Sequence, residues 1–321
     1  MELKGASVMV TGGAGFIGSH LVDRLIAEEP ARIVVCSNYF LGSDSNLAGA
    51  MESFGALSVH RVDIGDYDEV RKIVEDEGVE VVFNLAVIPL PTSLEKPEWT
   101  IEENVRMTTS ICRLAREGLV STLIQFSSSE AYGSARYSPM DESHPLNPET
   151  PYAASKAATD HIALSYGRTF GIDVSVIRPF NNYGPRQNWG AYAGIIPLTI
   201  KRIMTGEPIT VYGDGLQTRD FIYVTDTAEA VVQVARSEKT RGMVLNAASG
   251  TEVAMIDLLN MIAGAMDYRE PFKHVEARPG DVRRHIADVT LIKELVGFEP
   301  RVGIEEGIQT TVDWYKANMK L

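Results

Sequence analysis

The chain contains a tyrosine and a lysine four residues apart, a pair whose residue types and spacing are suited to acid–base chemistry. Tyr152 and Lys156 lie in the segment Pro151–Phe170, which we predict to be a helix because proline suits the first position of a helix. Residues four apart share one helix face. A nearby ammonium group favours the phenolate and lowers the pKa of a tyrosine. The pair is therefore a candidate general base for removing a proton from a hydroxyl group.

A run of hydroxyl groups and one carboxyl group precedes this helix. Ser128, Ser129 and Glu130 follow Thr122–Ser127, an apolar run that predicts a buried strand. Side chains at the end of a central parallel strand lie on the edge of the sheet where ligands bind. The run is therefore a second candidate for catalysis, although serines and acids at a strand end also serve as helix caps.

A third candidate is the glycine-rich segment near the N-terminus. Gly12, Gly15 and Gly18 have the spacing G-x-x-G-x-x-G, and Phe16 and Ile17 lie between the last two. This spacing between a strand and a helix permits a tight turn, close approach of a pyrophosphate and close packing of the helix. We therefore predict a dinucleotide site, with a packing turn that binds no ligand as the alternative.

The end of the second predicted strand departs from the usual dinucleotide pattern. An acid at this position normally binds the adenosine ribose hydroxyls and selects NAD, but the chain has Ser37 followed by Asn38. The first arginine or lysine after this point is Arg61, more than twenty residues on, so a nearby clamp for a 2′-phosphate is not apparent, and we favour NAD over NADP. Asp63 and Ile64, after the third strand, are candidates for the adenine side of the site; Asp63 could instead cap a helix.

These residues must be positioned by strands that alternate with helices. Such alternation predicts βαβ units and an α/β fold with a doubly wound parallel sheet, Rossmann-like, covered on both faces. The strand predictions are Ala6–Thr11, Arg32–Ser37, Leu57–Val62, Val79–Leu85, Thr122–Ser127, Asp173–Ile177 and Arg241–Asn246. The helix predictions are Gly15–Glu28, Tyr67–Glu77, Trp99–Glu117, Pro151–Phe170 and Thr225–Ser237.

The alternation loosens after Pro179, where proline and glycine become frequent. We therefore predict a dinucleotide-binding domain over residues 1–180, to which residues 225–247 return. A smaller interleaved α/β lobe would comprise residues 181–224 and 248–321 and bind the substrate.

The composition excludes several classes of protein. The chain has 321 residues, 43 acidic against 30 basic side chains and a formal net charge of −13, which argues against a nucleic-acid binder or a basic membrane-surface protein. No apolar run approaches the roughly 20 residues that span a bilayer. The two cysteines cannot build a disulfide framework, and no cluster has the spacing of a metal site. The first strand begins too early to leave room for a signal peptide, so we expect a cytoplasmic protein.

Further motifs occur in a fixed order along the chain. Besides the glycine loop, the serine run and the Tyr-x-x-x-Lys pair, they are Asn84-Leu85-Ala86, the run Arg178-Pro179-Phe180-Asn181-Asn182-Tyr183-Gly184-Pro185-Arg186, Tyr212-Gly213-Asp214-Gly215, the run from Arg219 to Val224, and Arg278-Pro279-Gly280-Asp281. Over nearly its whole length, the chain resembles the extended short-chain dehydrogenase/reductase family of nucleotide-sugar epimerases, dehydratases and decarboxylases.

The resemblance implies roles for individual residues. It makes Ser128, Tyr152 and Lys156 the catalytic set, with Lys156 also on the nicotinamide ribose. It places Leu85, Ala86 and Asn104 along the NAD channel and implies a homodimer formed through the helices near Thr100–Arg116 and Tyr152–Phe170. The side chains implied in holding the nucleotide-sugar are Ser129, Asn181, Arg186, Arg219 and Arg283.

Glu130 bears on which reaction the resemblance implies. Many hexose 4,6-dehydratases of the family carry Thr-Asp-Glu where this chain has Ser128-Ser129-Glu130, so the usual aspartate is absent. We expect a dehydratase of a UDP-hexose such as UDP-N-acetylglucosamine, in which Glu130 runs the elimination across carbons 5 and 6. The product would be a 5,6-ene or a 4-keto-6-deoxy sugar. The alternatives are a 4-epimerase with Glu130 as scaffolding, and a dinucleotide-sensing protein without enzymatic activity. A decarboxylase would need a partner for the substrate carboxylate, and the sequence offers none.

Overall fold

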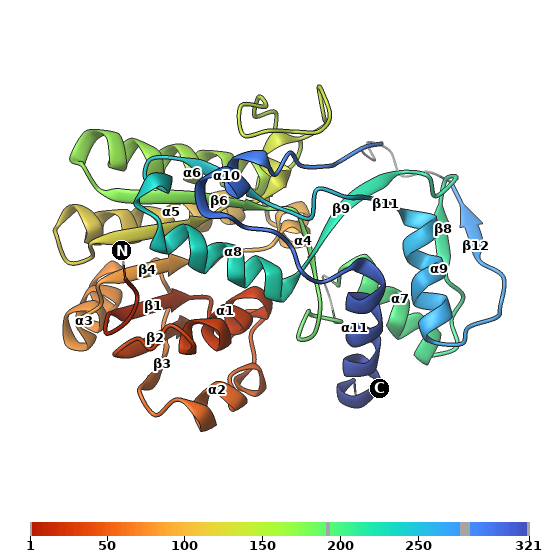
Figure 1. The fold of residues 1–321 in the computed structure, drawn as a ribbon, viewed down its shortest axis with the longest axis horizontal. Coiled ribbons are helices and arrows are strands. Elements are labelled where there is room, and N and C mark those ends of the chain that lie inside the picture. Colours follow the sequence, from red (N-terminus) through yellow and green to blue (C-terminus); the bar gives the residue numbers. More distant parts are fainter. Residues whose placement is uncertain (1, 191–192, 277–282, 320–321) are drawn as a thin grey trace.

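The computed structural model describes residues 2–190, 193–276 and 283–319, and its centre is a seven-stranded sheet in which all pairs are parallel (Figure 1). The fold class is therefore the predicted Rossmann-like α/β fold. The strand order is β10-β6-β5-β4-β1-β2-β3. The strands are β1 (Ser7–Thr11), β2 (Arg32–Ser37), β3 (Leu57–Arg61), β4 (Val81–Asn84), β5 (Thr122–Phe126), β6 (Asp173–Pro179) and β10 (Val244–Ala247).

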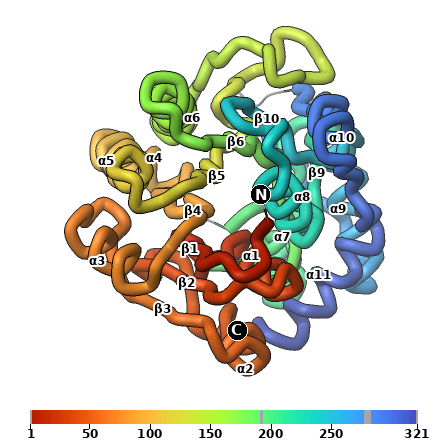
Figure 2. The backbone as a smooth tube through the Cα atoms, turned by 60° about the vertical axis from the view of Figure 1, so that its left-hand side comes forward, coloured from red at the N-terminus to blue at the C-terminus, as the bar shows by residue number. Residues whose placement is uncertain are grey.

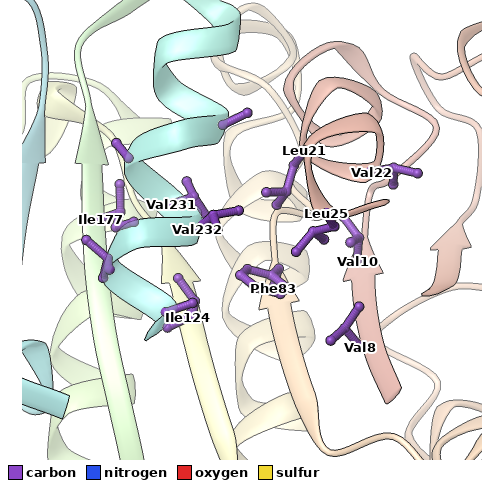
Figure 3. Packing of buried hydrophobic residues seen from close by; sticks show 14 of the residues in the cluster. Val8, Val10, Leu21, Val22, Leu25, Phe83, Ile124, Ile177, Val231 and Val232 are labelled. Atoms are coloured by element: carbon purple, nitrogen blue, oxygen red, sulfur yellow. The ribbon is translucent and has the colours of Figure 1, made fainter. Parts of the chain in front are cut away.

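Helices cover both faces of this sheet. The helices around it are α1 (Phe16–Ile26), α2 (Ala48–Ser53), α3 (Tyr67–Glu77), α4 (Leu90–Glu95), α5 (Pro97–Arg116), α6 (Pro151–Phe170), α8 (Val224–Arg236) and α10 (Thr290–Val296). One face packs against α1 and α8, and Figure 3 shows Phe83 of the sheet near Leu25 of α1 and Ile124 on the side of Val231 of α8. The other face packs against α3, α5 and α6. Both faces of a parallel sheet are therefore buried, which explains its continuous apolar strands.

The local sequence explains where α6 and α3 begin and end. The Thr150 side chain accepts a hydrogen bond from the amide of Ala153, and Pro151 occupies the first turn of α6. Gly171, with a left-handed φ of 70°, ends the helix. In α3, the Asp66 side chain caps the start of the helix, and Gly78, also left-handed, ends it. Both helices and β2 have the predicted bounds, and α6 presents Tyr152 in its first turn.

Other predicted elements differ from the structure by one to three residues. The strand predicted to begin at Val79 begins at Val81, because the amide of Val79 still bonds the carbonyl of Val74 at the end of α3. The strand predicted from Arg241 begins at Val244, because Gly242 has a φ of 74° and stands in a turn. Strand β6 runs two residues beyond its prediction, to Pro179, and so carries the chain directly to the sheet edge.

A smaller lobe stands beside the carboxyl edge of the sheet, and it is built from segments on both sides of α8 and β10 (Figures 1 and 2). Its core lies between α7, α9, α11 and a three-stranded sheet, β11-β9-β7. Its elements are β7 (Asn181–Tyr183), α7 (Ile195–Met204), β8 (Thr210–Tyr212), β9 (Thr218–Tyr223), β11 (Glu252–Ala254), α9 (Met255–Ala265), β12 (Lys273–Val275) and α11 (Ile304–Asn318).

Short 3-10 turns complete the described chain: η1 (Asp44–Asn46), η2 (Ser129–Tyr132) and η3 (Glu238–Thr240). None of the helices in the described ranges is long and apolar enough to cross a bilayer. Across residues 2–190, 193–276 and 283–319, no group of three or more His, Cys, Asp or Glu side chains is arranged to hold a metal ion.

Candidate active site

A cleft of about 420 Å³ lies at the carboxyl ends of the central strands, where parallel sheets bind ligands. Its walls come from the glycine loop, the ends of β2, β4, β5 and β6, the start of α6 and the loop after β7. The lining residues that the sequence singled out are Gly12, Gly15, Phe16, Ile17, Gly18, Asn38, Ile64, Leu85, Ala86, Ser128, Tyr152, Lys156 and Arg186.

The glycine loop has the geometry of a cradle for a close-packed ligand. Gly12 has a left-handed φ of 67°, and a Cβ there would lie 3.2 Å from the Cα of Ala86. A Cβ on Gly18 would lie 2.4 Å from the carbonyl oxygen of Gly12, so only glycine lets α1 approach the loop this closely. The first turn of α1 has no acidic residue and its N-cap, Gly15, has no side chain. The uncapped start of the helix therefore suits an anionic group.

The charge of the cleft supports the same conclusion. Among the described residues that line it there is no aspartate or glutamate, although the chain carries 43 acids. Its cations are Lys156 and Arg186. The cleft is therefore fitted to a ligand with negative charge, within a protein whose net charge is −13.

A ladder of polar side chains fixes the floor of the cleft. The Thr11 hydroxyl donates to the amide oxygen of Asn84 at 2.8 Å, and Asn84 donates to Gln125 at 2.8 Å. The backbone amide of Ala86 donates to the Thr11 hydroxyl at 3.0 Å. These buried bonds tie the ends of β1, β4 and β5 together and set the position of Leu85 and Ala86.

Ser128, Tyr152 and Lys156 meet on the opposite wall. The Tyr152 phenol is hydrogen-bonded to Ser128, which lowers its pKa, but burial outweighs this and raises the pKa to about 12. Burial also lowers the pKa of Lys156 to about 8. The Lys156 ammonium donates to the carbonyl of Phe126.

In the chain itself burial therefore raises the pKa of Tyr152, opposite in direction to the lowering expected from Lys156 together with an oxidised nicotinamide. Spacing places the two residues on one helix face, but it does not determine the direction of the lysine side chain. Because the ammonium is held by the Phe126 carbonyl, the surroundings of the phenol are dominated by burial and by the nearby carboxylates of Glu130 and Asp160.

A buried ion pair behind Lys156 escaped the sequence analysis. Asp160 has no exposed surface and accepts hydrogen bonds from the Ser127 hydroxyl at 2.8 Å and from Nε of Arg178 at 2.9 Å. Burial raises the pKa of its carboxyl group, whereas Arg178 and Lys156 lower it. The position of Asp160, four residues after Lys156, is the signal that could have identified it.

Glu130 lies beside this set without lining the cleft. It belongs to η2, and its amide donates to the Ser128 hydroxyl at 3.2 Å. Burial raises the pKa of its carboxyl group, and Arg219 acts in the opposite direction. Its charge also raises the pKa of Tyr152. Glu130, Ser128 and Tyr152 therefore form one interacting group.

Ser129 is buried in the same turn and does not line the cleft. Its backbone holds His285 by a hydrogen bond, and burial together with the Arg219 charge lowers the pKa of His285 to about 4. His285, which sequence reasoning missed, is thus a neutral imidazole packed against Phe180, with ring centres 5.0 Å apart.

Asn104 and Asp63 act away from the cleft surface. Asn104 accepts a hydrogen bond from the amide of Ile88 at 2.7 Å and donates to the Ser155 hydroxyl at 2.9 Å, so it holds a lining segment against α6. Asp63 is paired with Arg106 at 2.6 Å and also accepts from the amide of Gly65. Asp63 therefore neither lines the cleft nor caps the next helix, because the N-cap of α3 is Asp66.

The residues predicted to hold a substrate are spread over three environments. Arg186 lines the cleft in a left-handed conformation, with φ 66°, and pairs with Asp23 at 2.7 Å. Asn181 and Arg219 do not line the cleft. Asn181 donates to the carbonyl of Asp220, and the Arg219 charge lowers the pKa of Glu130. Arg283 is exposed, away from the lining, and forms two 2.9 Å bonds to Asp214. The Arg278–Asp281 motif lies outside the described residues.

Comparisons with known proteins agree with this geometry. Residues 9–311 match the family described as GDP-mannose 4,6 dehydratase. The chain is 34% identical to the UDP-glucose 4-epimerase of Mycolicibacterium smegmatis, over 96% of its own length and 98% of that protein.

Two solved structures have nearly the same fold. One is the UDP-N-acetylglucosamine 4-epimerase of Methanobrevibacter ruminantium M1 in complex with UDP-N-acetylmuramic acid, with a TM-score of 0.91 and 33% identity over 98% of this chain and 100% of the other. The other is the dTDP-glucose 4,6-dehydratase DesIV of Streptomyces venezuelae with NAD and TYD bound, with a TM-score of 0.90 and 31% identity over 97% of each chain.

Proposed function

Because the chain belongs to the extended short-chain dehydrogenase/reductase family, in the branch described as GDP-mannose 4,6 dehydratase, we propose that it is an NAD-dependent nucleotide-sugar dehydratase. Its substrate class is a UDP-hexose such as UDP-N-acetylglucosamine. Its motifs resemble those of the UDP-N-acetylglucosamine 5,6-dehydratase of tunicamycin biosynthesis. A solved epimerase with this fold holds a UDP-sugar, which supports the choice of nucleotide.

The residues of the cleft fit the proposed cofactor. The tight glycine loop and the uncapped start of α1 suit the pyrophosphate. Lys156 lines the same cleft, which supports assigning it to the nicotinamide ribose. When bound, NAD⁺ would accept the hydride from carbon 4 of the sugar, and the cofactor would return to its oxidised form within each turnover. A dehydratase of this fold has been solved with NAD bound.

The proximity of Glu130, Ser128 and Tyr152 is the observation that carries the proposal. Tyr152 removes the proton from the carbon-4 hydroxyl, and Ser128 orients the phenol by their hydrogen bond. A ketone at carbon 4 acidifies the proton at carbon 5. Glu130 stands next to Ser128 and Tyr152 although it does not itself line the cleft, and burial raises its pKa. We assign to it both the uptake of the carbon-5 proton and the delivery of a proton to the departing carbon-6 hydroxyl, which requires its carboxyl group to turn toward the sugar.

The nucleotide diphosphate is expected to lie toward the smaller lobe. Arg186 already lines the cleft, and Arg219 is close enough to act on Glu130, whereas Asn181 contributes through its bond to Asp220. Arginine binds a diphosphate in a bidentate manner, which suits these positions. Arg283 would join them only by leaving Asp214. Residues 181–224 and 248–321, apart from α10, which packs against α8 and β10 beside the central sheet, are accordingly the part that we assign to the sugar nucleotide.

A 4-epimerase is the second candidate, because Ser129 occupies the position where many dehydratases have an aspartate. The curated and solved relatives include 4-epimerases. A dinucleotide-sensing protein without activity is less well supported, since Ser128, Tyr152 and Lys156 are all in place at the cleft.

Incubation with UDP-N-acetylglucosamine in deuterated water, followed by proton NMR, tests the proposal. We expect solvent deuterium at carbon 5 or a new vinyl signal, and Glu130→Gln should abolish both. Glu149→Gln is the matched control, because Glu149 is an exposed carboxylate that also influences Glu130. Clean conversion to the galacto isomer without exchange at carbon 5 would establish the epimerase instead.

We also infer a homodimer formed through α5 and α6. These helices pack together on one face of the sheet. Large apolar side chains stay exposed at their ends and on the preceding α4, namely Leu94, Trp99, Ile101 and Phe170. Sedimentation equilibrium of the purified protein should give twice the 35.2 kDa chain mass; a monomer at micromolar concentration would contradict this.

A further inference from the structure

The ends of β2 and β3 bring together two residues that are far apart in the sequence. Ser37 is the register partner of Arg61 in this parallel pair. Val35 and Val59, two residues earlier in each strand, both pack into the core on the α1 side. Because side chains alternate along a strand, Ser37 and Arg61 lie on that same side of the sheet, next to the glycine loop.

Tyr39 holds the guanidinium group near this point. The Arg61 Cζ atom lies 5.5 Å from the centre of the Tyr39 ring, a distance at which a cation and an aromatic face attract. The amide of Tyr39 donates to the Ser37 hydroxyl at 3.2 Å, and its phenol donates to Asp44 at 2.5 Å. Arg61 is exposed and makes no ion pair with any residue that the structure describes, so its charge is available to a ligand.

The ribose of the adenosine half of a dinucleotide binds at the end of this second strand. A carboxylate there accepts hydrogen bonds from the 2′- and 3′-hydroxyls and repels a 2′-phosphate, whereas a nearby arginine accommodates the phosphate. Here the strand ends in Ser37 and Asn38, which line the cleft, and no carboxylate lines it among the described residues. Arg61, stacked on Tyr39 just outside the lining, is the cation of the next strand.

We propose that Ser37, Asn38 and Arg61 form an adenosine-ribose subsite that admits a 2′-phosphate, so that the protein binds NADP⁺ as well as NAD⁺. The inference rests on the proposed function only in that the cleft holds a dinucleotide. It is independent of which sugar is used and of whether water is lost.

A competition experiment on the full-length protein measures this selectivity directly. The protein is incubated with equimolar NAD⁺ and NADP⁺ until exchange is complete and is then freed of unbound nucleotide. It is denatured, and the released nucleotides are quantified by chromatography and mass spectrometry. We expect the released NADP⁺ and NAD⁺ in a ratio within about tenfold of one. The two nucleotides differ only in the 2′-phosphate, and one charge interaction with Arg61 changes the affinity by about this factor.

Two substitutions assign the effect to the subsite. Arg61→Gln should lower the share of NADP⁺ by about tenfold while NAD⁺ stays bound, and Ser37→Asp should lower it by at least as much. Arg32→Gln is the matched control, because it removes the same charge from the opposite end of β2 and should leave the ratio unchanged. Arg61 is exposed, so its variant tests the proposal even if Ser37→Asp, at a buried position, does not fold.

Loading with NAD⁺ in more than about tenfold excess would overturn the inference, as would an Arg61→Gln ratio equal to that of the wild type. Both outcomes leave the proposed dehydratase intact. Failure to release either nucleotide would instead count against the proposed function, and this inference would fall with it.

Discussion

The two walls of the cleft differ in the kind of chemical groups that they contain. The wall at the glycine loop consists of backbone and neutral side chains, where a single added methyl group at Gly18 would collide with Gly12. The wall at β5 and α6 contains Tyr152, Lys156 and Asp160, ionisable groups whose pKa values are all shifted, with burial as the largest cause. Cofactor binding thus depends on shape and helix geometry, whereas the chemistry depends on charges that the fold holds out of water.

Removing the phenol is the most drastic way to separate the two walls. Tyr152→Phe should lower kcat by about 10²–10⁴-fold, the range for a lost general base, while cofactor binding changes little. Product formation measured by mass spectrometry, together with titration of NAD⁺, checks this. Unimpaired turnover in the variant would remove Tyr152 from the catalytic assignment.

The buried ion pair should dominate the stability of the catalytic wall. Asp160→Asn leaves the guanidinium of Arg178 without its charge partner inside the protein, which should cost about 3–5 kcal/mol of unfolding free energy. Urea denaturation followed by circular dichroism measures it. A loss below about 1 kcal/mol would place Asp160 in the same class as surface pairs.

The pH dependence of stability should single out Lys156. Its pKa in the folded protein, about 8, lies below the ordinary lysine value of 10.5, so below pH 8 the folded protein bears the cost of a buried ammonium. That cost is relieved as the pH rises from 8 to 10.5, because the unfolded chain then binds the extra proton. Relative to wild type, Lys156→Met should therefore gain most below pH 8, by up to about 3 kcal/mol, and lose this advantage by pH 10.5. Urea unfolding at both ends of this interval tests it; a difference that is constant with pH would contradict the shifted pKa.

At the glycine-loop wall, an added methyl group should change cofactor affinity and stability, because this wall depends on close packing and not on charged side chains. Gly18→Ala places a Cβ 2.4 Å from the Gly12 carbonyl oxygen, so the loop must shift, and we expect weaker cofactor binding and about 1–3 kcal/mol lower stability. Gly264→Ala is the control, because that helical glycine has open space around its Cβ and should gain about 0.5–1 kcal/mol. Thermal melts with and without NAD⁺ compare the two. Equal behaviour of both variants would argue against a close-packed loop.

The smallest effect is expected at Arg283, whose pair with Asp214 is exposed to solvent. Asp214 has a pKa lowered to about 2 by this contact, but solvent screens such pairs. Arg283→Gln should leave urea unfolding unchanged within error, in contrast to Asp160→Asn. If Arg283 leaves Asp214 to bind the diphosphate, the KM for the sugar nucleotide will rise while kcat stays the same.

Local signals in the sequence were sufficient for the elements that carry the site. Proline and a threonine cap at 150–151 set the start of α6, and therefore the place of Tyr152, and the glycine spacing set the loop. Features that depend on side-chain direction or on strand register could not be predicted in this way. Three such features each join residues far apart in the sequence. They are the hydrogen bond from Lys156 to Phe126, the bond that holds Arg283 on Asp214 away from the cleft, and the pairing of Arg61 with Ser37.

The role of Glu130 is the central claim, and the product mass tests it most directly. Wild-type protein and Glu130→Gln are each incubated with UDP-N-acetylglucosamine, and the nucleotide-sugar products are measured by mass spectrometry. The account predicts loss of one water with the wild type and none with the variant. A wild-type product of unchanged mass, or water loss that survives in the variant, would contradict it.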